Sequence, residues 1–137
     1  MALDPLVQKM EAEELKLLVE TAGELVFASD GEAIEALRTV TFESPDLIDG
    51  GDVALPAVDL AAAYFLILGN VGRVLTRVIS QRARRVLDEE GIEYQAASSV
   101  KSLPERYAAP MAEYDRRARS AVTPQAFLVE LKRIRDR

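Results

Sequence analysis

Arginine is the residue type whose spacing best supports chemistry in this chain. Residues 73–85 hold five arginines, and at about 100° per residue on a helix three of them fall on one stripe. Guanidinium groups in a stripe can follow the phosphates of a nucleic acid, with an affinity that falls as salt rises. A second basic cluster, interleaved with tyrosines, follows near residue 116. The candidate nucleic-acid contacts are Arg73, Arg77, Arg84, Arg116, Arg117 and Arg119.

A purely structural interpretation is favoured for each cluster. The first forms a solvated surface or pairs with acids of the first helix. In the second, Tyr107 and Tyr114 match the apolar stripe of their helix, so core packing is favoured. Arg82 differs from the others because the same helical wheel places it on the apolar side, between Ile79 and Val86. Three explanations stay open for Arg82: the helix leaves the core there, a buried acid holds the guanidinium, or the residue lies in a subunit contact, where arginine is enriched.

Most catalytic chemistry is excluded by composition, because the chain has neither histidine nor cysteine. There can be no disulfide, no Cys/His zinc site, no thiolate nucleophile and no Ser-His-Asp triad. A pair of carboxylates could still perform acid–base chemistry, but the 23 acidic residues single out no pair. We therefore expect no enzyme, no cofactor and no metal site.

The elements that would position these residues read as helices. Asp4 and Pro5 fit the N-cap and first turn of a helix, and Thr123-Pro124 repeats the pattern near the end. Apolar residues recur at helical spacing between such signals. The sequence predicts an all-α bundle of about five helices in a single domain over 1–137, with helices at about 5–28, 33–40, 53–90, 105–122 and 124 onward.

The helix at about 53–90 is expected to form the centre of the bundle. Its first part, Val53 to Leu68, is the most apolar stretch of the chain, but Pro56 and Asp59 interrupt it. We expect no membrane span, since that needs about 20 uninterrupted apolar residues. Two glycines within 69–72 predict a kink, and Gly91 is placed to end the helix.

Charge divides the chain into an acidic half, 1–60, and a basic half, 61–137. The first holds 14 acids and three bases (3 − 14 = −11), and the second 14 bases and nine acids (14 − 9 = +5). The halves could dock on each other within one domain, which is favoured. They could also pair between copies or offer the basic half to an acidic partner.

Because most catalytic chemistry is excluded by composition, we expect the protein to be a non-catalytic helical interaction or assembly subunit. It would act as a homo-oligomer or as a small part of a larger protein complex; the alternative is a nucleic-acid-binding accessory protein. The N-terminus has no signal-like run, so we expect a cytoplasmic protein. The predicted interface is the helix face formed by Val71, Val74, Leu75, Val78, Ile79, Arg82 and Val86.

Overall fold

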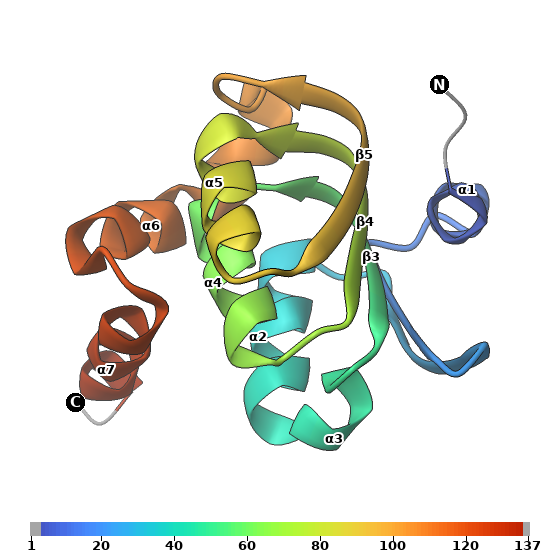
Figure 1. Ribbon diagram of the computed structural model, residues 1–137, viewed down its shortest axis with the longest axis horizontal. Coiled ribbons are helices and arrows are strands. Elements are labelled where there is room, and N and C mark those ends of the chain that lie inside the picture. The colour runs from blue at the N-terminus through green and yellow to red at the C-terminus, as the bar shows by residue number, and fades with distance from the viewer. Residues whose placement is uncertain (1–3, 136–137) are drawn as a thin grey trace.

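A five-stranded sheet lies at the centre of the molecule, with helices on its two sides (Figure 1). The computed structural model describes residues 4–135. The strands are β1 (Leu17–Thr21), β2 (Glu24–Ser29), β3 (Asp52–Val58), β4 (Arg73–Ser80) and β5 (Glu93–Val100). The helices are α1 (Pro5–Ala12), α2 (Ala33–Glu43), α3 (Pro45–Ile48), α4 (Leu60–Leu68), α5 (Gln81–Glu89), α6 (Glu105–Ala121) and α7 (Pro124–Arg135). The fold is α/β, so the predicted all-α bundle is wrong.

All strands except β1 run in one direction. The strand order is β2-β1-β3-β4-β5. β1 is antiparallel to both β2 and β3, whereas β3, β4 and β5 are mutually parallel neighbours. The carboxyl ends of β2, β3 and β4 therefore meet at one edge of the sheet, which we call the carboxyl edge. Helices α2, α4 and α5 each begin there, because each follows one of these strands.

The helices cover the two faces of the sheet unequally. Figure 1 shows α1 alone on one side, while α2, α4 and α5 lie on the other and α6 and α7 lie beyond them. The centre of the larger layer is α4, whose residues 60–66 are all buried. Phe65 of α4 packs its ring 5.7 Å from Phe42, 5.8 Å from Tyr114 and 5.3 Å from Phe127. Within residues 4–135 no helix is both long and apolar enough to cross a bilayer.

The predicted helix over 5–28 is correct only for its first part. Asp4 accepts a hydrogen bond from the Leu6 N–H and Pro5 opens the helix, as predicted, but α1 ends at Ala12. Residues 17–29 form a hairpin instead. At its turn Ala22 and Gly23 have φ of 53° and 79°, and two positive values in succession are typical of a tight hairpin turn.

The predicted helix over 53–90 is divided into β3, α4, β4 and α5. Its strands are buried on both faces, so they lack the alternation that identifies an exposed strand. The glycines at 69–72 form a turn rather than a kink. A Cβ on Gly72 would lie 2.6 Å from the carbonyl oxygen of Gly50, so this close approach of two turns requires glycine.

Candidate functional site

Asp59 accepts hydrogen bonds from three groups at the carboxyl edge. It directly follows β3, and its side chain accepts the Leu60 N–H at 2.8 Å and so caps α4. Ser80, at the end of β4, donates its hydroxyl to Asp59 at 2.8 Å. The Arg82 guanidinium donates through Nε at 2.6 Å and Nη2 at 2.7 Å. Burial by itself would raise the pKa of Asp59, but these donors outweigh burial and hold the pKa below 3.8.

A second buried carboxyl, from Asp115 of α6, lies beside Asp59. It accepts the Ala61 N–H at 2.9 Å, and only 3% of the residue is exposed. Burial, the negative charge of Asp59 and a hydrogen bond with that side chain raise the pKa of Asp115 to about 6. Two adjacent carboxyls rarely ionise together, so below about pH 6 Asp115 holds a proton while Asp59 stays charged with Arg82.

The two carboxyls fix the position of α6. Asp59 belongs to the β3–α4 junction, and Asp115 reaches the same junction from 54 residues away in the sequence. A further hydrogen bond joins α4 to the end of α6, since the Tyr64 hydroxyl donates to the Val122 carbonyl at 2.7 Å. As a result, the C-terminal half of α6 is held against the first turns of α4.

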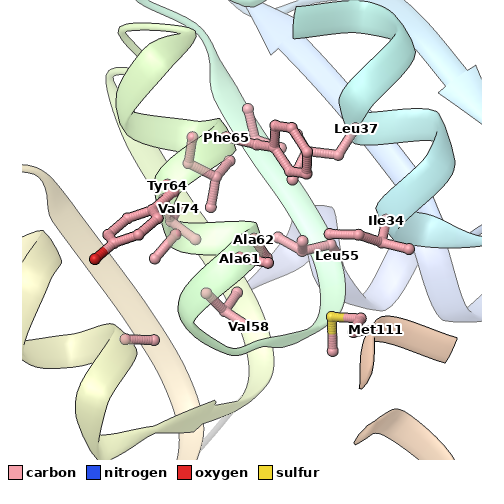
Figure 2. Close-up of a cluster of buried hydrophobic side chains, with 14 of the residues drawn as sticks. Ile34, Leu37, Leu55, Val58, Ala61, Ala62, Tyr64, Phe65, Val74 and Met111 are labelled. Atoms are coloured by element: carbon pink, nitrogen blue, oxygen red, sulfur yellow. The ribbon is translucent and has the colours of Figure 1, made fainter. Parts of the chain in front are cut away.

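A cavity of about 360 Å³ opens between α6 and the carboxyl edge. Figure 2 shows three of its lining residues, Ile34, Leu55 and Met111, meeting from α2, β3 and α6. The polar lining residues are Lys16, Glu32, Arg106 and Tyr107. The remaining lining residues are Ala33, Pro56, Ala57, Ala62 and Pro110.

The cavity is placed where helix N-termini concentrate partial positive charge. Three helices begin at the carboxyl edge, and two of them are capped: α4 by Asp59, and α5 by Ser80, which accepts the Ala83 N–H. The N-terminus of α2 has no side-chain cap, although Glu32 occupies the N-cap position. Ala33 and Ile34, the first residues of α2, line the cavity together with Lys16 and Arg106.

Most arginines of the predicted nucleic-acid surface have partners within the chain. Arg73 pairs with Asp52 at 3.0 Å and Asp4 at 3.8 Å, and Arg77 pairs with Glu11 at 2.6 Å. Each of these acids belongs to the acidic half, so the two halves do dock on each other. In the basic half, Arg84 bonds the side chains of Tyr94 and Ser99, and Arg116 and Arg117 share Glu113. Arg119 is exposed on α6.

The residues of the predicted interface do not form one exposed helix face. Val71, Val74, Leu75, Val78 and Ile79 are at most 5% exposed, and the last four belong to β4. Val86 is partly buried against the same core. Arg82 is at the start of α5, where the structure shows a buried acid, Asp59, as its partner.

Neither the carboxyl pair nor the cavity was identified from the sequence. Asp59 and Ser80 both stand between a β-branched run and a helix, a pattern that marks strand ends in α/β folds. Asp115 carried a weaker signal, since it lies one helical turn after the buried Met111. Recognising the strands was therefore the step needed to bring these residues together.

Comparison with known proteins supports the fold and defines the family. Residues 6–106 match a family model described as "TM1506: Domain of unknown function (DUF1893)". A solved DUF1893 family protein, TM1506 from Thermotoga maritima, is similar with a TM-score of 0.69 and 19% identity over 96% of this chain and 92% of that chain. No curated protein is significantly similar. Because the family model spans most of the chain, from α1 to the start of α6, the protein belongs to the DUF1893 family.

Proposed function

We propose that the protein is a small-molecule binding domain whose ligand is an organic anion held in the cavity at the carboxyl edge. One observation carries this proposal: the uncapped N-terminus of α2 opens on a cavity that also has Lys16 and Arg106 in its wall. Backbone N–H groups at a helix start, together with nearby cations, are a common arrangement for binding phosphate or carboxylate. No reaction is assigned.

The size and lining of the cavity support a ligand with an apolar body. A volume of about 360 Å³ is near the lower end for small-molecule sites, about 300 to 1,000 Å³. Met111 and Pro56 offer apolar contacts, and Tyr107 offers a ring whose face is partly covered by Arg106, 4.7 Å away. In α/β sheets, ligands commonly bind beyond the carboxyl ends of the strands.

Binding to a panel of phosphate and carboxylate compounds tests the proposal, with affinities measured by calorimetry. For a compound that binds, Arg106→Gln should weaken the affinity about tenfold or more, because a charge-assisted hydrogen bond contributes about 1.5–3 kcal/mol. Glu32→Gln should act in the opposite direction and strengthen binding, since it removes a negative charge from the site. Lys9→Gln on α1, which lies on the other side of the sheet (Figure 1), is the matched control.

Equal affinities in all three variants would place the ligand elsewhere, and failure of every anion to bind would refute the proposed function. The assembly and nucleic-acid hypotheses and the cytoplasmic location remain predictions. For nucleic acid, pairing of Arg73 and Arg77 with acids reduces the charge available to phosphates.

A further inference from the structure

A second cavity, of about 350 Å³, lies where α2, the end of α4 and α7 meet. It shares no lining residue with the cavity at the carboxyl edge. Most of its described wall is apolar, with two cations and one hydroxyl added and no carboxylate. The described lining residues are Arg38, Thr41, Phe42, Leu68, Leu128, Leu131 and Lys132.

Thr41 gives this cavity a polar group that has no partner. The residue is 5% exposed, and its Oγ1 is the one buried side-chain oxygen or nitrogen without a hydrogen bond in the described part of the chain. A threonine inside a helix commonly bonds the carbonyl one turn earlier, but Thr41 does not. A buried hydroxyl without a partner is unfavourable, and valine would fill the same space without that cost. Thr41 lines the cavity, so this unpartnered donor belongs to a residue of its wall.

The two cations come from different helices that line the cavity, Arg38 from α2 and Lys132 from α7. Arg38 donates one N–H to the Tyr114 hydroxyl at 2.9 Å, and Tyr114 donates in turn to Glu35 at 2.7 Å. This partner is uncharged, and a guanidinium carries five donors in all. Arg38 can therefore still bind an anion while it keeps its bond to Tyr114.

We propose that this second cavity binds an amphipathic carboxylate, with an apolar chain against Phe42, Leu68 and Leu131 and the carboxylate between Arg38 and Lys132. The Thr41 hydroxyl donates to a ligand oxygen. The combination of an apolar wall, two cations, no acid and one unpartnered hydroxyl matches this chemistry and no purely polar ligand. A molecule the size of decanoate suits the volume.

The first experiment is a titration of the full chain with decanoate and, separately, with 1-decanol. Binding is detected by NMR of a carbon label placed on the carboxylate carbon of decanoate or the hydroxyl-bearing carbon of 1-decanol. Saturable binding is expected for decanoate, with an affinity about tenfold or more above that of the alcohol, because only the carboxylate meets the two cations. Lys132→Gln should remove most of this preference while the affinity for 1-decanol stays unchanged. Lys9→Gln, on the far side of the sheet, should keep the preference.

Thr41→Val separates a ligand contact from a merely structural role. The variant should unfold at a higher temperature than the wild type without ligand, because it removes an unpartnered buried hydroxyl. It should also bind decanoate about fivefold more weakly, because it removes a hydrogen-bond donor. A purely structural role predicts the same rise in unfolding temperature with unchanged affinity, and that result would overturn the assignment of the hydroxyl.

Three further outcomes would overturn the site itself. The first is the absence of saturable decanoate binding in the wild type. The second is binding that Lys132→Gln and Thr41→Val both leave unchanged. The third is a second copy of the chain as the true occupant. In that case light scattering would show a dimer that Leu131→Glu dissociates, and decanoate would bind to neither form. None of these results depends on the cavity at the carboxyl edge. The proposed function and the proposed second site can therefore each be refuted without the other.

Discussion

The buried carboxyl of Asp115 should make the protein less stable as the pH rises from 5 to 7. Its pKa is about 6 in the folded protein against 3.8 in an ordinary aspartate. The folded state therefore binds more protons than the unfolded state across this interval, and stability falls as pH increases. The full loss is about 3 kcal/mol at high pH, and about 1 kcal/mol of it falls between pH 5 and pH 7.

The interval is well suited to this measurement because the chain has no histidine. Glu11, Asp59 and Glu113 have pKa values below those of ordinary carboxyls, held down by arginine partners that, for Asp59, outweigh the raising effect of burial. Their contribution to stability depends on pH in the opposite direction to that of Asp115. It is lost as the pH falls through their lowered pKa values. It is fully present from pH 5 upward. Asp115 thus dominates the slope.

Asp115→Asn tests the assignment directly. Asparagine keeps an oxygen for the Ala61 N–H and offers an N–H₂ group to Asp59, so it resembles the protonated acid. The free energy of unfolding, measured in urea at several pH values, should fall by about 1 kcal/mol between pH 5 and pH 7 in the wild type and remain nearly constant in the variant.

The matched control is Asp46→Asn, which changes an exposed aspartate of α3 and should keep the wild-type slope. A wild type equally stable at the two pH values, or a variant that keeps the full slope, would refute the claim that Asp115 holds a proton in the folded protein.

Three other substitutions address the packing around the site. Arg82→Gln should lower the free energy of unfolding in urea by about 2–3 kcal/mol, because it leaves the carboxylate of Asp59 without its cation. The Asp59 side chain is only 4% exposed. A loss under about 0.5 kcal/mol would show that this ion pair does not stabilise the fold. Gly72→Ala should cost about 1–3 kcal/mol because of its backbone clash, whereas Gly31→Ala, whose nearest contact is a side-chain oxygen at 3.5 Å, should be nearly neutral. Val122→Gly should raise the unfolding temperature, because a valine with φ of 72° is strained; an unchanged or lower value would contradict that strain.

Local signals in the sequence predicted three helix ends, namely the starts of α1 and α7 and the end of α5. The cap by Asp4 is present, Thr123 accepts the Ala126 N–H ahead of α7, and Gly91 has φ of 70° just after α5. Each of these features depends on residues a few positions apart, so it can be identified without knowing the fold.

The strands and the site could not be recognised in the same way. β3 and β4 are buried on both faces, and their apolar runs have no period that distinguishes strand from helix. Arg73 and Arg77 do lie on one face, as the helical wheel suggested, but the reason is different. They are four residues apart in a strand, where every second side chain points to the same face of the sheet. Asp59 and Asp115 are brought together only by tertiary structure, which sequence spacing does not reveal.

The burial of α4 also has a consequence for synthesis of the chain. Phe65 of α4 packs on Phe127 of α7, and the Tyr64 hydroxyl bonds the Val122 carbonyl. On the ribosome, at about 5–20 residues per second, α7 begins to appear roughly 3–11 s after α4 is complete. During that time the nascent protein exposes one of its most apolar segments. Aggregation and chaperone binding should therefore depend on how quickly the last two helices are delivered.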